Sequence, residues 1–328
     1  MRGLRLAALP LAGFAILGFI AAAAPALAQD KYPSRPIRIV LPFAAGSVSD
    51  VTLRIMADKL GARLGTSVIV DNQPRAGGTT AAAAALSSAR DGYTLVTFSS
   101  STAISVSLLK GMPYDPVADF VPVSGLSTFA NIIAVNASSK YDTLPKLLQA
   151  AFDTPGMLNI GTTTVGSTNH LAATLLKSMS GLNFVIVPFR TPGDLVTAAL
   201  RNDVDGIIQS YGALKSAIEA KQIKALGSTT PARAPYAPDV PTVDESGVKG
   251  FDVVTWNGVF APTGTPPEIV DTLNREIAAV LADPDLKKRY AELGLEPLPT
   301  GPAALGGLLK NEVRKWARVI KDAGIEQQ

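Results

Sequence analysis

The chain has no cysteine and a single histidine, His170, among its 328 residues. Without cysteine it can form no disulfide, and it has no thiol nucleophile and no thiolate ligand for a metal. With one histidine, a metal site built from several imidazoles is excluded as well. The residue types therefore predict no metal and no cofactor, and they leave the buried core as the source of stability.

Net charge is also small. Arg2 and Arg5 are the only basic residues among the first 28, which hold no acid, so 28 basic and 27 acidic residues remain and leave a net charge of +1. Proteins that bind nucleic acid usually carry a clear excess of positive charge. We therefore expect no nucleic-acid partner.

The longest apolar run lies near the N-terminus, from Leu6 to Ala24. Arg2 and Arg5 precede it, and Ala26-Leu27-Ala28 matches a small-x-small cleavage site. We interpret residues 1–28 as a signal peptide that is cleaved after Ala28 during export. The run is long for a signal peptide, so an uncleaved membrane anchor is the alternative.

Short apolar segments alternate with small polar turns and helical patterns along the rest of the chain. Strands are expected at residues 38–41, 67–70, 93–98, 158–160, 184–189, 204–208 and 223–226. This alternation is typical of parallel sheets covered by helices. Residues 132–135 and 253–256 look like strands without an adjoining helix, and we interpret them as hinge strands between two domains. Helices are expected at 269–281, 284–293 and 303–323.

Five strand-to-helix junctions share glycine, serine and threonine: residues 44–49, 77–80, 99–102, 162–169 and 191–194. Ligands of open α/β sheets bind beyond the carboxyl ends of the strands. The free N–H groups in the first turn of a helix favour an anion there. For one junction, ordinary N-capping is the better explanation, but five with the same chemistry favour a cleft for a carboxylate.

Four charged or titratable residues lie near these junctions. His170 either caps and packs the start of a helix or donates a hydrogen bond to a ligand. Asp50 is explained by the helix dipole and Asp205 by turn formation. Arg190 either pairs with an anion or is a solvated loop residue.

Motifs for other chemistry are missing. The sequence has no Gly-Lys-Ser/Thr and no Gly-x-Gly-x-x-Gly after a strand, so nucleotide cofactors lack support. No Gly-x-Ser-x-Gly elbow accompanies His170, which argues against a secreted hydrolase.

Seven short motifs follow one another in a characteristic order: Pro42-Phe43-x-x-Gly46-x-x-x-Asp50, Asp71-Asn72-Gln73-Pro74-x-Ala76-Gly77-Gly78, Asp91-Gly92-Tyr93-Thr94-Leu95, Pro113-Tyr114-Asp115-Pro116-x-x-Asp119-Phe120, Val204-Asp205, Asp239-Val240-Pro241-Thr242-Val243 and Phe260-Ala261-Pro262-x-Gly264-Thr265-Pro266. Together they resemble the Bug family, the periplasmic substrate-binding proteins of tripartite tricarboxylate transporters. The resemblance runs from about Tyr32 to Ile325.

The resemblance implies an α/β, type II periplasmic binding-protein fold, with two Rossmann-like lobes joined by hinge strands that close like a Venus flytrap. We expect lobe 1 to hold residues 30–130 and 252–328, and lobe 2 residues 131–251. The expected ligand is a small carboxylate: a di- or tricarboxylate, an amino acid or an aromatic acid. The protein would be a monomer that catalyses nothing and delivers its ligand to a membrane permease. Signalling to a membrane sensor protein is the alternative that the residues leave open.

In the family, the first strand-to-helix loop and the loop before the helix that carries His170 hold the carboxylate. The resemblance therefore assigns ligand contacts to Phe43, Gly46, Ser47, Asp50, Thr164, Gly166, Ser167 and His170. It assigns lining or supporting roles to Gly77, Gly78, Ser99, Phe189 and Asp205. Adjacent positions complete the predicted site: Ala45, Ser100, Val165 and Arg190.

The chain departs from the family pattern at three places. The first loop, commonly Pro-Pro-Gly-Gly, reads Ala44-Ala45-Gly46-Ser47 here. Val165 replaces a common asparagine, and Phe189 a usual tyrosine. We expect a looser first loop and a ligand with a less polar end. We also expect Ser167→Ala to weaken carboxylate binding by about 1–3 kcal/mol and leave the fold intact.

Overall fold

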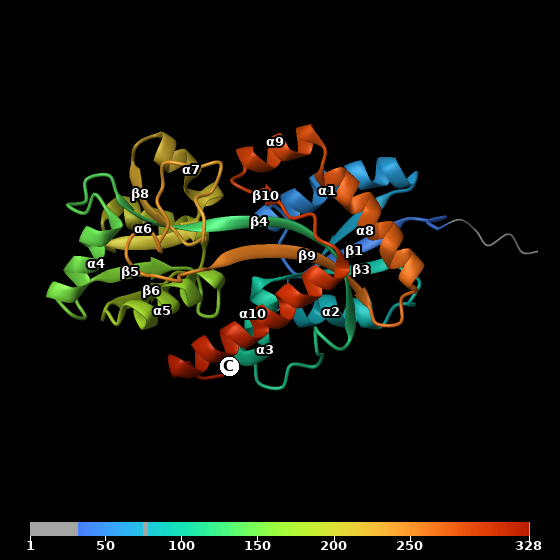
Figure 1. Cartoon of the computed structure of the whole chain (residues 1–328), viewed down its shortest axis with the longest axis horizontal. Helices are drawn as coiled ribbons and strands as arrows, with labels where there is room; N and C mark the ends of the chain where they lie inside the picture. The colour runs from blue at the N-terminus through green and yellow to red at the C-terminus, as the bar shows by residue number, and fades with distance from the viewer. Residues whose placement is uncertain (1–31, 75–77, 328) are drawn as a thin grey trace, which may run out of the picture. The chain divides into compact units, whose positions relative to one another are not determined.

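The computed structural model describes residues 32–74 and 78–327. The predicted signal peptide and Gly77 lie outside the described residues. Figure 1 shows strands and helices alternating along most of the chain. The strands are β1 (Ile37–Leu41), β2 (Val68–Asn72), β3 (Thr94–Ser99), β4 (Phe120–Asn136), β5 (Asn159–Thr162), β6 (Val185–Pro188), β7 (Gly206–Ser210), β8 (Ile223–Ser228), β9 (Val254–Pro262) and β10 (Glu296–Pro297). The helices are α1 (Val48–Leu64), α2 (Thr79–Leu86), α3 (Ser100–Leu108), α4 (Leu144–Asp153), α5 (Thr168–Ser180), α6 (Pro192–Arg201), α7 (Tyr211–Glu219), α8 (Pro267–Leu281), α9 (Pro284–Glu292) and α10 (Pro302–Asp322).

The helices begin where short polar residues satisfy their first N–H groups. A side-chain oxygen accepts a hydrogen bond from the first turn at the start of six helices: Ser47, Ser99, Thr143, Ser167, Thr191 and Asp283. Four of these caps precede α1, α3, α5 and α6, which follow strands directly. At four of the five predicted junctions the small polar residues therefore act as helix caps, whereas α2 begins at Gly78 without a side-chain cap.

The sheet has two halves that share one strand. The strand order is β2-β1-β3-β9-β4-β7-β5-β6, with β8 and β10 also pairing with β4. Residues 120–130 of β4 pair with β9, and residues 131–136 pair with β7 and β8. We call the β4–β9 side with β1, β2, β3 and β10 the first half, and the side with β5 to β8 the second half. Figure 1 shows β4 and β9 as the long strands that run across the middle.

The expectation of purely parallel sheets was only partly right. The pairs around β1 and β5 are parallel, as predicted. All pairs formed by β4 or β9 are antiparallel. β4 is also much longer than the predicted strand 132–135. Its register shifts after Pro122 and Gly125, and such bulges break the apolar alternation by which a strand is recognised in sequence.

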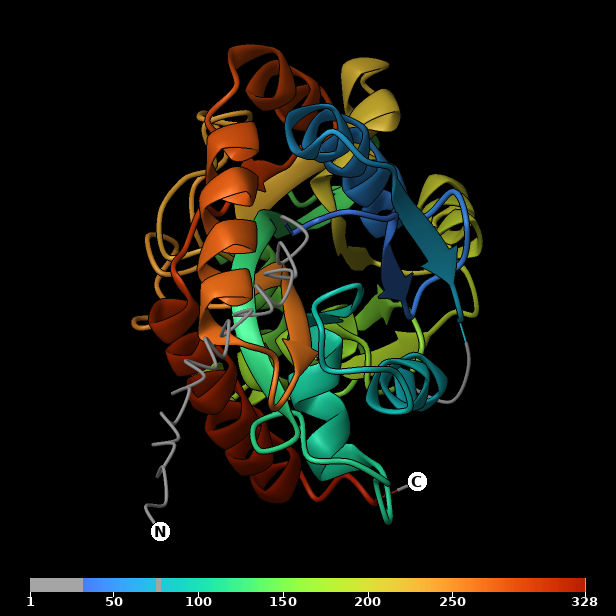
Figure 2. The same cartoon turned by 90° about the vertical axis from the view of Figure 1, so that its right-hand side faces the viewer.

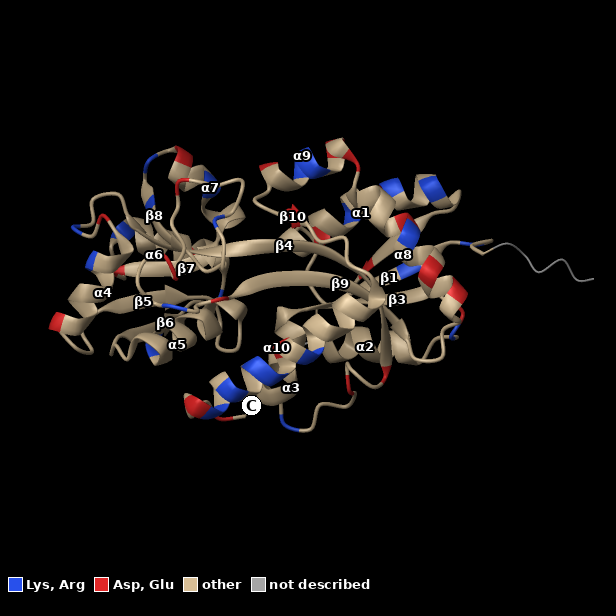
Figure 3. Cartoon of the chain, viewed as in Figure 1, with Lys and Arg blue, Asp and Glu red and all other residues tan. Residues whose placement is uncertain are grey.

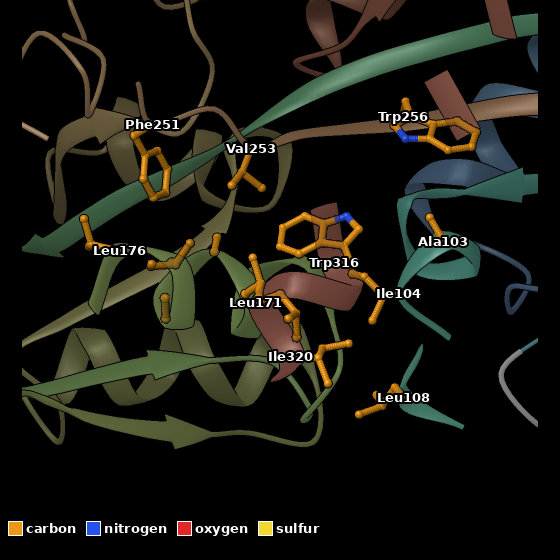
Figure 4. Packing of buried hydrophobic residues seen from close by; sticks show 14 of the residues in the cluster. Ala103, Ile104, Leu108, Leu171, Leu176, Phe251, Val253, Trp256, Trp316 and Ile320 are labelled. Carbon is orange, nitrogen blue, oxygen red and sulfur yellow. The ribbon is translucent and has the colours of Figure 1, made fainter. Parts of the chain in front are cut away.

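The two halves share a hydrophobic core on one face of the sheet. Trp316 of α10 lies between Ile104 of α3 and Leu171 of α5, and all three side chains are fully buried (Figure 4). α10 packs against α3, β4 and α5, so the C-terminal helix contacts both halves. On the opposite face the cores are separate: one lies under α1, α8 and α9, and the other under α6 and α7.

Charged residues lie on the outer surfaces of the helices that cover the sheet. Figure 2 shows α8 in orange and α10 in red near the long strand β4, against which both pack. In Figure 3, both basic and acidic residues lie along these and other helices on the side that the view shows. No helix among the described residues is long and apolar enough to cross a membrane.

Candidate ligand-binding cleft

A cavity of about 200 Å³ lies where the carboxyl ends of strands from both halves meet. Its lining comes from both halves and from the strand that they share: Phe43, Ser49, Ser99, Ser101, Phe129, Asn131, Thr163, Ser167, Thr168, Asn169, Pro192, Gln209, Ser210, Thr255 and Asn257. None of these described residues is charged. Hydroxyl and amide groups supply the polar surface, and two phenylalanines supply an apolar part.

The same turn occurs next to this cavity once in each half. Gly46 and Gly166 both have φ of 80°, a left-handed conformation that favours glycine. Each is followed by a serine whose N–H bonds back three residues, from Ser47 to Ala44 O at 3.2 Å and from Ser167 to Thr164 O at 3.0 Å. Each serine hydroxyl then caps the next helix, accepting a 3.2 Å hydrogen bond from the N–H three residues on.

Asp50 organises the first of these turns. Its carboxylate accepts hydrogen bonds from Gly46 N–H at 2.8 Å, from Arg54 Nε at 3.0 Å and from Asn72 Nδ2 at 2.9 Å. Asn72 also donates to Phe43 O, which ties the beginning of the turn to the same network. Burial opposes ionisation of the carboxyl, but these hydrogen bonds outweigh it and lower the pKa of Asp50. Both oxygens of the buried Asp50 carboxylate accept hydrogen bonds within this network, so Asp50 holds the loop and does not line the cavity.

His170 stands at the matching position of the second turn and behaves differently. Its backbone N–H donates to Ser167 Oγ, while its Nδ1 is buried without a partner in the described structure. The ring lines a separate cavity of about 370 Å³ with Lys177 and Asp322. Burial lowers the pKa of the imidazole. Because no carboxylate reaches back to Gly166, its N–H has no acceptor among the described residues.

Helix N-termini converge on the cavity. Residues in or next to the first turns of α1, α3, α5, α6 and α7 line it: Ser49, Ser101, Thr168, Asn169, Pro192 and Ser210. The N–H groups of Ser49, Thr168 and Asn169 have no acceptor in the described part of the chain. Such groups carry partial positive charge. The site can therefore hold an anion by neutral donors alone.

Of the predicted ligand residues that the structure describes, three line the cavity: Phe43, Ser99 and Ser167. Their neighbours in the two turns lie directly beside it along the chain: Ala45, Gly46, Ser47, Thr164, Val165 and Gly166. Ser100 is fully buried and turns away, since its hydroxyl donates to Val254 O and accepts from Trp256 N–H. It joins α3 to β9.

Four predicted residues lie elsewhere. The side chain of Phe189 packs in the core under α6 and α7. Arg190 is exposed and forms no ion pair within the described residues. Asp205 precedes β7 and accepts a 2.8 Å hydrogen bond from Asn159 N–H, so it lies at the amino ends of β5 and β7, opposite the cavity. Gly78 caps α2 close to Pro42 and does not line the cavity.

The sequence interpretation missed the contribution of strands β4, β7 and β9. Phe129, Asn131, Thr255 and Asn257 come from β4 and β9, and Gln209 is the next-to-last residue of β7. A signal was present, because Asn131 and Gln209 are polar residues that each adjoin a run of apolar residues in their strand. Burying an amide is costly unless it is paired, so such positions suggest a special role.

Two larger hollows, of about 540 and 480 Å³, lie away from the strand ends. One lies beside α4 and the C-terminal end of α5, and the other beside α3 and the loop after it. Neither collects helix N-termini. No group of three or more potential metal ligands occurs in residues 32–74 and 78–327.

A family model described as "Tripartite tricarboxylate transporter family receptor" matches residues 52–325. The chain is 35% identical to the UPF0065 protein in the tcbD-tcbE intergenic region of Pseudomonas sp. strain P51, over 94% of this chain and 92% of that one. It is 33% identical to protein BugT of Bordetella pertussis, over 94% of this chain and 97% of that one.

Solved structures show the same fold. The periplasmic binding protein BugD is 32% identical with a TM-score of 0.76, covering 90% of this chain and 100% of its own. R. palustris Rpa4515 with adipate is 32% identical with a TM-score of 0.80 and the same coverage. MatC from Rhodopseudomonas palustris with bound malate is 29% identical with a TM-score of 0.74, over 88% of this chain and 100% of that one.

The predicted resemblance to the Bug proteins and the type II binding-protein fold are thus confirmed. The chain belongs to the receptor family of tripartite tricarboxylate transporters, and it is a solute-binding receptor rather than an enzyme.

Proposed function

We propose that this protein captures a small carboxylate in the 200 Å³ cavity and delivers it to the permease of a tripartite tricarboxylate transporter. The observation that carries the proposal is the convergence of several helix N-termini on a cavity whose described lining has no charge. Adipate and malate, the ligands named for two structures of the same fold, are small dicarboxylates. A cavity of this size is smaller than the roughly 300–1,000 Å³ of drug-sized ligand pockets, which suits such an acid.

The proposed lobes follow the change of strand pairing in β4. Residues 30–130 and 252–328 would move as one lobe and residues 131–251 as the other. Each lobe presents one glycine-serine turn to the cavity, so a ligand that contacts both turns stabilises the closed arrangement. Gly166 also packs on Leu108, a contact between the second turn and the first half.

We further propose that the receptor acts as a monomer in the periplasm after cleavage behind Ala28. The mass of the mature protein, measured on material secreted to the periplasm, tests the cleavage, and light scattering in solution tests the oligomeric state. A mass that includes residues 1–28 would instead favour the uncleaved anchor.

Calorimetric titration tests the ligand class. The mature protein, unfolded and refolded to remove carried ligand, is titrated with adipate, malate, citrate, glutamate and benzoate. Binding of at least one acid tighter than about 1 mM, roughly −4 kcal/mol, is expected. If none binds that tightly, the carboxylate proposal is wrong.

Deletion of the gene tests delivery to a permease. Loss of solute uptake supports delivery, whereas loss of gene induction with uptake intact supports signalling to a membrane sensor.

A further inference from the structure

Gln209 is a buried amide at the wall of the candidate site. It follows Ile207 and Ile208 in β7, pairs with Ile132 of β4, and is only 4% exposed while lining the 200 Å³ cavity. A valine or isoleucine at this position could form the same strand without burying a polar side chain. The retained amide therefore calls for hydrogen-bond partners.

The oxygen of this amide is fully engaged. Gln209 Oε1 accepts from Ser210 N–H at 2.7 Å and from Asn169 Nδ2 at 3.1 Å. Asn169 is itself held, because the same Nδ2 donates to Ile208 O at 3.0 Å. If the Gln209 amide were rotated by half a turn, its own N–H groups would face the N–H donors of Ser210 and Asn169. The network thus determines which end of the Gln209 side chain is the donor.

That donor has no partner. Gln209 Nε2 is buried and without an acceptor in the described structure. Four other buried side-chain atoms share this property: Thr97 Oγ1, Tyr114 Oη, His170 Nδ1 and Trp256 Nε1. Of the five, only Gln209 Nε2 belongs to a residue that lines the cavity.

We propose that Gln209 is a specificity-determining residue whose Nε2 donates a hydrogen bond to an oxygen of the bound acid. The inference rests on the proposed function and names the group in the second half that recognises the ligand. Asn169 acts as a positioning residue, since it holds the oxygen of the amide and leaves the nitrogen as the end without a partner in the described structure. The first turn of α5 begins beside this amide, so the ligand atom there is an oxygen that carries negative charge.

Gln209→Glu separates this role from a structural one. A carboxylate of nearly the same shape still accepts from Ser210 and Asn169, so the local structure is expected to be kept, at a cost in stability for the buried charge. It offers no donor and adds a negative charge. Titration with adipate and malate at pH 8 should show binding weaker by roughly 10- to 100-fold. Gln222→Glu, the same change at an exposed position of the same half, is the matched control and should bind as the wild type does.

Acidification gives a second readout. Once protonated, the introduced carboxyl group is again a donor, so the affinity ratio between Gln209→Glu and wild type should rise toward one as the pH falls to about 5. A purely structural role predicts no such recovery. If Gln209→Glu fails to fold, the side-chain ¹⁵N–¹H signals of Gln209 in wild-type protein replace it, and they should shift when malate or adipate is added.

The outcomes separate the two proposals. Equal affinity of Gln209→Glu and wild type, or unmoved Gln209 amide signals at saturation, overturns the role of Gln209 and leaves the carboxylate receptor standing. Failure of wild type to bind any acid overturns the proposed function and the role of Gln209 together.

Discussion

Asp50 and His170 occupy equivalent positions in two similar turns, yet their side chains make different contacts. Asp50 reaches back to Gly46 and closes its turn, whereas the His170 ring leaves Gly166 N–H without an acceptor among the described residues. The second turn thus keeps one more donor for a ligand. This difference comes from a single pair of residues and not from the backbone, which has the same φ at both glycines.

Replacing Asp50 by asparagine should destabilise the fold. An amide cannot accept all three hydrogen bonds, so we expect a loss of roughly 2–3 kcal/mol in the free energy of unfolding at pH 7. The pKa of Asp50 is lowered in the folded state, so its contribution is complete above about pH 4 and is lost as pH falls through the folded pKa. Urea unfolding at pH 7 and pH 3 measures it. Asp58→Asn, exposed on the same helix, is the control; equal stability of the two variants at pH 7 would refute the role of Asp50.

His170 should make the fold less stable in mild acid. Burial lowers its pKa when folded, so the unfolded chain takes up a proton near pH 6.5 while the folded chain does not. Its effect is absent above that pH and destabilising below it. We expect His170→Gln to lose less stability than wild type between pH 8 and pH 5, measured by urea unfolding. Lys177 and Asp322 share its cavity and are unchanged in the variant. Identical pH slopes would contradict the expectation.

Ser167 caps a helix and also lines the cavity. Its hydroxyl accepts from His170 N–H and from Thr163 Oγ1. Ser167→Ala therefore removes a helix cap, worth about 1 kcal/mol of stability. We therefore expect Ser167→Ala to fold, but with a stability lower by the contribution of the cap. The carboxylate affinities of variant and wild type have to be compared under conditions in which both proteins are fully folded.

At the scale of elements, the two turns differ in their surroundings. A Cβ atom added to Gly46 would meet nothing within 4 Å, whereas one added to Gly166 would overlap with Leu108 Cδ2 at the end of α3. The second turn is thus packed against the other half, whereas the first has open space beside its glycine. This supports a cleft in which the contact between Gly166 and Leu108 is part of the closed arrangement.

Alanine at the two glycines tests that packing. Gly46→Ala should cost about 1–2 kcal/mol, because only the left-handed conformation is penalised. Gly166→Ala should cost about 1–3 kcal/mol more, since the added methyl group also displaces Leu108. Adding Leu108→Ala should relieve part of the extra cost, which a double-mutant cycle of unfolding free energies measures. Equal costs at both glycines would show that the turn does not press on α3.

At the scale of the whole molecule, the described residues form one body through a core that spans both halves. Trp316, Ile104 and Leu171 bring α10, α3 and α5 together on one face of the sheet. The opposite face carries two separate cores. Relative movement of the halves is therefore expected to bend β4 and β9 while the shared core keeps them joined.

Trp316→Ala should weaken the molecule as a whole. We expect a loss of roughly 3–5 kcal/mol and a single unfolding transition in the wild type, because the shared core belongs to both halves. Urea unfolding followed by circular dichroism and by fluorescence measures both quantities. Phe152→Ala, at an exposed position of α4, should change stability by about 0.5 kcal/mol or less. Two separated transitions in the wild type would show that the halves fold independently.

The amino-acid sequence alone predicted the alternation of strands and helices, because apolar runs and caps such as Ser47 and Ser167 are local signals. It also determined the family, through motifs that need only order and spacing. The three C-terminal helices were predicted nearly to the residue for the same reason. Of the predicted ligand residues, those in the two turns reach or flank the cavity, since their position depends on the strand-to-helix junction alone.

Which polar groups line the cavity depends on contacts between residues that are far apart in sequence. Asp50 and Ser100 looked like ligand residues, but contacts with Asn72 and β9, remote in sequence, occupy them. Asn131, Asn257 and Gln209 were overlooked, because a strand's polar residue gains its role from what the sheet places opposite it. The donor of Gln209 is the clearest case: Asn169, 40 positions earlier, holds its oxygen and so leaves its nitrogen without a partner in the described structure.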